Sequence, residues 1–407
     1  MKKIKSINCY SFYKVIIVAV FSAIVLSCGK EESPNPMPDP TPEPGPSPEF
    51  YQSIDAGFNH SFGIAPNDEL WGWGSNSVGQ IGDSNQVFNR GPILIDSGYV
   101  SISAGGEVST STHGGIFGVP ITYTFYFCHT LGLRKDGTLW AWGNNVFGQL
   151  GVGNILTHKT PVQVGSGFVA IAAGNLHSLA LKEDGTLWAW GRNQEGQLGD
   201  GTFVSQSVPI LVGSDYIAIA ADGGQSYALK ADGTLWAWGW NNYGQLGDNS
   251  TENRNSPLHI GSDFIKIAAG GGHCLAIKSD HTLWAWGANG DGQLGDGTFL
   301  DRHQPVFIDN ECESIDAGRE FSLAIKSDGS LWAWGGNSQG QVGSGSWENQ
   351  NLPIQIGLSY SSISAGGLHS LALKTDGTLW AWGSNTFGQL GNGDFVNQDK
   401  PVRIFHP

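Results

Sequence analysis

The chain has 407 residues, with 60 Gly, 16 Trp and a charged fraction of only 14%. Acidic residues outnumber basic ones by 36 to 21, which gives a formal net charge of −15 at pH 7. Nucleic-acid binding requires a basic footprint, so this composition argues against nucleic acid as a partner. An acidic surface instead suits solubility and cationic partners or ions.

Residues 1–27 have the pattern of a lipoprotein signal peptide. They carry four Lys and no acidic residue, and an apolar run from Val15 to Leu26 is too short for an ordinary membrane-spanning helix. Val25-Leu26-Ser27-Cys28 resembles the cleavage box of lipoproteins, which makes Cys28 the predicted site of lipidation. Removal of this segment leaves 17 basic against 36 acidic residues. The alternative is simple secretion, with Cys28 incidental.

Residues 28–50 are predicted to be the lipid anchor and a linker. Gly29-Lys30-Glu31-Glu32 resembles the surface-export signal of some Gram-negative lipoproteins. Residues 33–48 alternate Pro with other residues, which favours an extended, semi-rigid spacer of about 3 Å per residue. We therefore expect a protein that is anchored to a bacterial cell envelope without spanning it, on the outer-membrane surface.

One phrase, Leu-Trp-(Ala/Gly)-Trp-Gly-x-Asn-x-x-Gly-Gln-(Leu/Ile/Val)-Gly, recurs through residues 51–407. Its first residue falls at Leu70, Leu139, Leu187, Leu235, Leu283, Leu331 and Leu379. The spacing is 48 residues from Leu139 onward, and the first interval is longer by 21. The predicted units are 51–98, 99–167, 168–215, 216–263, 264–311, 312–359 and 360–407, with an insertion at 106–128 in the second.

Each unit is predicted to form four short strands. In the third unit the first three are Phe168–Gly174, His177–Lys182 and Thr186–Gly191, and the fourth opens at Pro209. Asp184-Gly185 is a strong hairpin signal, in which both residues are expected to have positive φ. Asn67-Asp68 and Asp280-His281 replace it in the first and fifth units, with residue types that tolerate this conformation.

Four strands per unit with a Trp signature favour an all-β, seven-bladed β-propeller of four-stranded antiparallel blades. A linear solenoid would need atypical polar units at its ends, whereas the first and last units here are as regular as the others. The sequence leaves open whether the ring closes by whole units or by strand exchange.

The unit A-G-x-x-H-S-L-A-L-K-x-D-G-T-L-W-A-W-G-x-N-x-x-G-Q-L-G resembles the regulator-of-chromosome-condensation repeat, and the resemblance covers residues 51–407. The family's fold is a seven-bladed propeller. Its eukaryotic founder exchanges nucleotide on a small nuclear GTPase, and bacterial relatives include secreted propellers that bind and inhibit β-lactamases. The resemblance implies a protein-binding scaffold whose partner is set by the variable positions.

Residues that recur in every unit are expected to serve the unit itself. The Trp pairs should pack between blades, and the Asn and Gln of G-x-N-x-x-G-Q should hold their own loop. The recurring His is interpreted as a turn cap; it stands at His60, His129, His177, His273 and His369. Cys128, Cys274 and Cys312 are interpreted as small buried hydrophobes, with a Cys274–Cys312 disulfide as the alternative.

Function is expected where the units differ, and the insertion at 106–128 is the largest difference. It should project from the face that carries the turns between first and second strands. Phe117, Tyr123 and Phe125 are candidate contact residues, because apolar side chains in a long loop favour a binding surface. The alternative is a hairpin folded back on its own propeller.

Two further sets of residues are candidates. Phe299, Trp347 and Phe395 follow the Gly-Gln-(Leu/Val)-Gly end of units five to seven and are expected to form an arc, with Trp240 and Tyr243 nearby. Packing against the adjacent blade is the alternative. On the first strands, Asp55, Asp316 and Ser364 occupy one inward position and give the channel a polar side. That side suits either a small cation or water.

No pattern in the sequence indicates catalysis. There is no nucleophile elbow, phosphate loop or metal-ligand spacing, so we expect no enzyme, no metal and no cofactor. The favoured function is a monomeric binding scaffold that engages a protein or glycan through one propeller face. The alternative is a regulator of a partner enzyme, inhibitor-like or exchange-like.

Overall fold

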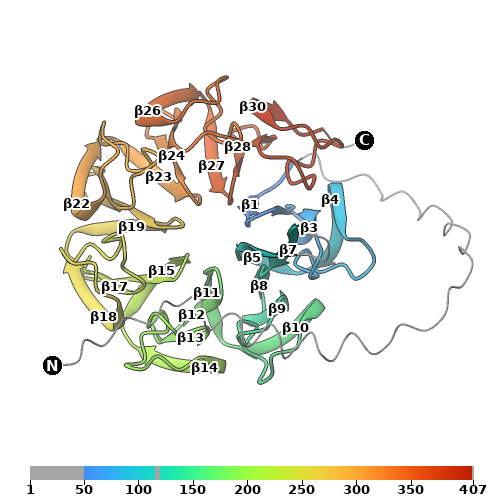
Figure 1. Cartoon of the computed structure of the whole chain (residues 1–407), viewed down its shortest axis with the longest axis vertical. Coiled ribbons are helices and arrows are strands. Elements are labelled where there is room, and N and C mark those ends of the chain that lie inside the picture. Colours follow the sequence, from blue (N-terminus) through green and yellow to red (C-terminus); the bar gives the residue numbers. More distant parts are fainter. Residues whose placement is uncertain (1–49, 115–119, 406–407) are drawn as a thin grey trace, which may run out of the picture. The chain divides into compact units, whose positions relative to one another are not determined.

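The computed structural model describes residues 50–114 and 120–405, and these residues form 30 strands and no helix. Twenty-eight of the strands make seven four-stranded sheets, which surround a central opening as the blades of a propeller (Figure 1). The remaining two pair with each other. The predicted all-β, seven-bladed propeller is confirmed.

Each blade is antiparallel and runs outward from the axis in chain order. The blades of the first half contain β1 (Ser53–Ala56), β2 (His60–Ile64), β3 (Glu69–Ser75), β4 (Phe88–Ser97); β5 (Tyr99–Gly105), β8 (His129–Arg134), β9 (Thr138–Gly143), β10 (His158–Ser166); β11 (Phe168–Ala173), β12 (His177–Lys182), β13 (Leu187–Gly191), β14 (Gln206–Gly213); β15 (Tyr216–Asp222), β16 (Gln225–Lys230), β17 (Leu235–Gly239), β18 (Arg254–Gly261). The others contain β19 (Phe264–Ala269), β20 (His273–Lys278), β21 (Leu283–Gly287), β22 (Arg302–Asp309); β23 (Cys312–Ala317), β24 (Phe321–Lys326), β25 (Leu331–Gly335), β26 (Gln350–Gly357); β27 (Tyr360–Ala365), β28 (His369–Lys374), β29 (Leu379–Gly383), β30 (Gln398–Arg403).

The hydrophobic core lies between blades. Trp190 of unit three is fully buried against Leu131 and Leu150 of unit two, and its Nε1 donates to Gln149 O of unit two at 2.8 Å. The first Trp of the pair, Trp188, is only half-buried and lies 4.7 Å from Lys182 Nζ. Because the third strand presents Leu and Ala on one face and Trp on the other, each blade fills the gap beside it.

The Asp-Gly turns differ from the prediction in one respect. Only the second residue has positive φ, 76° at Gly185, and the exceptions Asp68 and His281 take the same conformation with φ 64°. Asp184 instead uses its carboxylate to accept from the backbone N (3.0 Å) and hydroxyl (2.6 Å) of Thr186. The Asp side chain thereby closes the turn, so a second left-handed residue is unnecessary.

The recurring His joins neighbouring blades, and its interpretation as a turn cap is wrong. His177 Nε2 lies 2.8 Å from Ser226 Oγ of unit four, and Ser226 in turn donates to Gln197 O of unit three at 2.8 Å. The same contact between His369 and Ser61, at 2.8 Å, links the last unit to the first. Burial lowers the pKa of these imidazoles to about 3, so they are neutral at physiological pH.

The ring closes by whole units, since the first and the last blade each take all four strands from one unit. Closure uses bonds that also occur at other junctions. Trp73 Nε1 donates to Gln389 O at 2.9 Å, and Ser364 Oγ accepts from Ala56 N at 2.9 Å. Cys128, Cys274 and Cys312 are free thiols, each buried.

Candidate functional site

The two faces of the ring differ in what they present. Strand direction alternates along each blade, so the turns between first and second strands and the loops between third and fourth strands lie on one face. We call this the hairpin face, because the insertion between β5 and β8 emerges there as the two-stranded hairpin β6 (Val108–Gly114) and β7 (Pro120–Tyr126). The opposite face carries the Asp-Gly turns.

The hairpin is packed at its base and exposed farther out. The ring of Tyr126 meets the ring of Phe387 of unit seven edge-on, with 5.9 Å between ring centres. The ring centres of Phe127 and Phe147 of unit two are 6.5 Å apart. Phe125 is half-buried and stacks on Phe127 at 6.4 Å, whereas Tyr123 is 39% exposed. The base of the insertion therefore folds back on its own propeller, and its role as a contact surface stays a prediction for the exposed part. Phe117 lies outside the described residues.

The aromatic residues of the outer loops are exposed but do not form one cluster. Phe299, Trp347 and Phe395 are 52%, 48% and 42% exposed. No ring contact joins them within residues 50–114 and 120–405; Phe395 instead contacts Phe88 of unit one at 5.4 Å. Several aromatic residues of these loops have an exposed apolar neighbour in the sequence. The pairs are Phe203 and Val204, Phe299 and Leu300, Phe395 and Val396, and Val87 and Phe88. The expected arc is a set of separate exposed sites.

Trp240 and Tyr243 lie closer to the axis, above glycine turns. Their rings meet edge-on at 5.4 Å, and Trp240 N donates to Gly224 O at 2.8 Å. A Cβ on Gly224 would lie 3.1 Å from Trp240 Cβ, and one on Gly272 would lie 3.5 Å from the ring of Tyr243. The glycine turns of units four and five thus pack directly against this aromatic pair.

The polar side of the channel ties the first strands together. Asp55 Oδ2 accepts from Ala104 N at 2.8 Å, and Asp316 Oδ2 accepts from Ala365 N at 2.8 Å, each in the next blade. Ser364 makes the equivalent bond to unit one. Burial raises the pKa of Asp55 well above its usual range and that of Asp316 to about 6. These side chains therefore bond one first strand to the next, a role that the sequence pattern did not predict.

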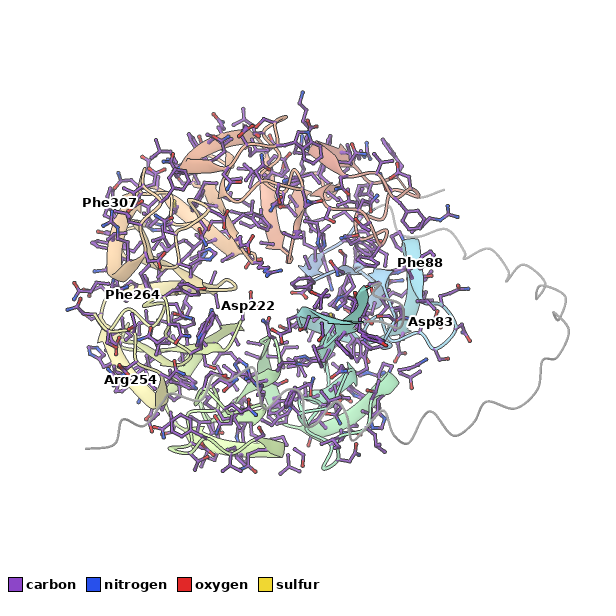
Figure 2. All side chains as sticks on the ribbon, in the orientation of Figure 1. Asp83, Phe88, Asp222, Arg254, Phe264 and Phe307 are labelled. Carbon is purple, nitrogen blue, oxygen red and sulfur yellow. The ribbon has the colours of Figure 1, made fainter. Side chains whose placement is uncertain are left out.

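A charged cluster at the mouth of the channel was missed. Asp222 of unit four stands where the repeat has Gly, and Figure 2 shows it on the inner edge of the ring. Asn175 of unit three, with its amide nitrogen toward Asp222, donates to Asp222 Oδ1 at 2.9 Å and to Gly106 O at 3.0 Å. In this orientation the amide oxygen of Asn175 lies 3.3 Å from Oε2 of Glu107, which is at the base of the hairpin.

Both carboxyl groups of this cluster have raised pKa values. Burial raises the pKa of Asp222 to about 7, the carboxylates of Asp316 and Glu107 add to the rise, and Arg319 opposes it. Burial likewise raises the pKa of Glu107. Because the amide oxygen of Asn175 can only accept, a proton on Glu107 completes that contact. The cluster therefore holds two carboxyl groups that burial makes harder to ionise, and the charge of Asp222 depends on pH near neutrality.

The sequence contained a signal for this cluster. Gly174 of unit three lies under His177, such that a Cβ there would come within 2.3 Å of the imidazole. Unit four replaces both residues of that pair, with Asp222 and Gln225. The loss of the imidazole removes the clash, so the paired change introduces a carboxylate at a position that glycine otherwise holds.

Other kinds of site are absent from the part of the chain that the structure covers. No group of three or more His, Cys, Asp or Glu among the described residues could hold a metal ion. None of these residues belongs to a helix able to cross a membrane. What the geometry offers is a surface for contact, composed of the hairpin, exposed aromatic side chains and a charged channel mouth.

Comparison with known proteins agrees with the fold. One model of the regulator of chromosome condensation (RCC1) repeat matches residues 51–80 and 360–389, and a second model of the same repeat matches residues 376–407. The chain is 31% identical over 116 residues to the ultraviolet-B receptor UVR8 of Arabidopsis thaliana, a match that covers 28% of this chain and 22% of UVR8. The chain thus spans about a fifth of the length of such curated relatives.

Solved structures match over most of the ring. Human WBSCR16 superposes with a TM-score of 0.70 at 22% identity, over 83% of this chain and 94% of that one. Yeast RCC1 (Prp20), in its structure with bound Kap60, superposes with a TM-score of 0.70 at 21% identity, over 92% and 91%. The RCC1-like domain matches residues 124–361, more than half of the chain, and the protein therefore belongs to the RCC1-like domain family.

Proposed function

We propose that this protein is a non-enzymatic scaffold, held on the surface of a bacterial cell envelope by a lipid on Cys28, that binds a protein partner through its hairpin face. Within the family, yeast RCC1 (Prp20) is known in complex with Kap60, and Prp20p of Saccharomyces cerevisiae has been studied for binding to Gsp1p and histones. Those partners belong to those proteins. They support protein, rather than a small molecule, as the class of ligand.

The observation that carries the proposal is the position of the hairpin. It rises from the face that also bears Trp240, Tyr243 and the exposed outer-loop aromatics, so the features that break the repeat gather on one side. Phe50, the first described residue, lies against the opposite face, where a Cβ on Gly377 would be 3.0 Å from its ring. The chain therefore enters the ring on the face opposite the hairpin.

The test uses the full-length protein in its native cells. In one variant, residues 106–128 are replaced by Asn-Leu, the two residues of the unit-three turn, so that unit two takes the standard length. We expect cross-linking and affinity capture to recover one stoichiometric partner with the native chain and to lose it with this variant. Phe307→Ser, which changes an exposed aromatic on the outer strand β22, is the matched control and should retain the partner.

Two outcomes would contradict the proposal. Equal capture by the hairpin variant and the native chain would remove the hairpin face as the contact. Cys28→Ala should release the protein from the membrane fraction, and protease added to intact cells should cleave the native protein. Protection from that protease in every growth state would refute surface display.

The hairpin also supports a second function, regulation of a partner enzyme. A hairpin that emerges from one face with its outer part exposed has the shape to enter a cleft of a partner. If the captured partner is an enzyme, the purified propeller should change its turnover, either by inhibition or by accelerated exchange of a bound ligand. The hairpin variant should lose this effect while unfolding at a similar temperature.

A further inference from the structure

The outermost strand of every blade is protected against pairing with another chain. An edge strand exposes unpaired backbone N–H and C=O groups, and a Pro or a bulge on it hinders the addition of a further strand. In each blade the fourth strand carries one Pro inside a stretch where its register with the third strand shifts. These residues are Pro92, Pro161, Pro209, Pro257, Pro305, Pro353 and Pro401.

The hairpin has a strand without these protections. β6 contains no Pro, Lys, Arg, Asp or Glu, and its pairing with β7 runs from Val108–Tyr126 to Gly114–Pro120 without a shift. In the part of the chain that the structure describes, β6 and β7 pair only with each other. A sheet of two strands is only marginally stable in water, so a third strand would stabilise the hairpin.

The backbone of β6 presents its outward groups in a regular row. Phe127 N donates to Glu107 O at 2.9 Å, so these two opposite residues form a hydrogen-bonded pair. The alternation of an antiparallel ladder then directs the N–H and C=O groups of Val108 and Thr110 away from β7. Outside the ladder, none of the hydrogen bonds among residues 50–114 and 120–405 reaches the backbone of either residue. Thr110 is also exposed, so its N–H and C=O are accessible.

The outer edge of β7 is less suited to a further strand. Tyr126 points its backbone outward in the same way, but its carbonyl oxygen accepts from Asn144 Nδ2 at 3.4 Å. Pro120, at the other end of β7, has no N–H to donate. Of the two edges of the hairpin, β6 is therefore the one that is open to pairing.

The two faces of the hairpin determine which side chains an added strand would carry. Ser109 and Ser111 of β6 lie opposite Phe125 and Tyr123 of β7, on one face. Because Ser is small, a large apolar side chain on a strand beside β6 can lie across it toward the ring of Phe125. Thr110 lies on the other face, where an uncharged polar neighbour is suitable. The matching segment therefore alternates apolar and uncharged polar residues.

We propose that the protein partner adds an extended, Pro-free segment to β6 as a third strand. Its apolar side chains lie on the face of Phe125 and its uncharged polar side chains on the face of Thr110. An extended polypeptide has backbone donors and acceptors at the spacing of β6, so main-chain bonds supply affinity and alternate side chains supply specificity. This inference rests on the proposed function and specifies how the hairpin holds its partner.

The probe is the peptide acetyl-Lys-Thr-Leu-Thr-Leu-Thr-Lys-amide, added to the full chain labelled with 15N-threonine. Thr110→Val and Thr124→Val identify the amide signals of these two residues, which lie directly opposite each other in the hairpin. We expect the peptide to shift the Thr110 signal and to slow exchange of the Thr110 amide hydrogen. The Thr124 amide should keep its exchange rate, because it points away from the opposite edge.

Two methylated peptides test whether the contact is made by the main chain. One carries N-methyl groups on its three Thr residues and the other on its two Leu residues. Alternate amides of a strand face opposite edges, so methylation of one set blocks pairing with β6 and methylation of the other set leaves it intact. We expect one of the two forms to lose binding and the other to retain it.

A matched pair of variants tests the edge from the side of the protein. Thr110→Pro removes an outward N–H that β7 does not use, and it should weaken peptide binding about tenfold. Thr124→Pro makes the same change at the exposed residue directly opposite on β7 and should bind the peptide like the native chain. Thr110→Val, which keeps the N–H, should also bind like the native chain.

Three results would overturn strand addition to β6: equal weakening by the two Pro variants, equal binding of the two methylated peptides, or slowed exchange at Thr124 in place of Thr110. Exchange at Thr110 that slows with protein concentration, in the absence of peptide, would show that a second copy of the chain occupies the edge. That result would also overturn the proposal.

Capture of the partner separates this inference from the proposed function. If replacement of residues 106–128 abolishes capture while Thr110→Pro retains it at the native level, the hairpin is the contact and strand addition is refuted. If both variants retain capture, the hairpin face itself is refuted as the contact. Loss of capture with Thr110→Pro, but not with Thr124→Pro, is the result that strand addition requires.

Discussion

The fit between Gly174 and His177 can be tested by a double-mutant cycle. Gly174→Ala places a methyl group 2.3 Å from the His177 imidazole, an overlap that the packed junction cannot relieve without shifting the ring from Ser226. The backbone at Gly174 does not have positive φ, so the change tests packing and not conformational strain. Overpacking of this kind costs about 1–3 kcal/mol of unfolding free energy.

The second arm is His177→Gln, which copies the residue that unit four carries. It breaks the 2.8 Å bond to Ser226 and costs about 1–3 kcal/mol, since a buried hydroxyl loses a partner. If the imidazole alone excludes a side chain at position 174, the double variant should be about as stable as His177→Gln alone. The coupling energy should then be about 2 kcal/mol in favour of the pair.

Urea unfolding followed by tryptophan fluorescence gives the comparison, provided that the dependence on urea concentration is the same for all four proteins. Gly185→Ala, in a turn on the opposite face, is a control for loss of glycine, because its positive φ predicts a cost that His177→Gln leaves unchanged. Strictly additive costs of Gly174→Ala and His177→Gln would refute the explanation of why unit four carries Asp222 together with Gln225.

Lowering the pH from about 6.5 to 3 should destabilise the ring. The buried His residues have pKa values near 3 in the folded protein, so they take up protons on unfolding in this range. His273→Gln removes one of them and should flatten the dependence of melting temperature on pH. The opposite sign applies to Asp316, whose folded pKa of about 6 lies above its unfolded value, so its contribution is present below about pH 4 and is lost as the pH rises through 6. Asp316→Asn, which still accepts from Ala365 N, should therefore melt higher than the native chain at pH 8, and equal or lower melting would contradict this account. Trp382→Phe removes the 2.8 Å bond to Gln341 O and leaves a gap between blades, at a cost of about 2–4 kcal/mol by urea unfolding, whereas Trp380→Phe at the half-buried position should cost less.

The repeat made the fold predictable from the sequence. A blade is a local structure, and its strand order, its turns and its Trp pair all come from one stretch of 48 residues. Seven copies of such a unit can satisfy their exposed flanks only against one another, which closes the ring. The insertion was identified for the same reason, since any departure from a period is visible.

The roles of single residues between blades depended on the tertiary structure. His369 bonds Ser61 across 308 residues, and Asp316 reaches the backbone of the next blade, so neither partner is apparent within one unit. The turns of units two, three and four bring Glu107, Asn175 and Asp222 together at the channel mouth. The sequence by itself determined the ring and the places where it is irregular. Only the packing of one blade on the next decided which irregular residues meet, because those contacts join positions in different units, about 47 residues or more apart.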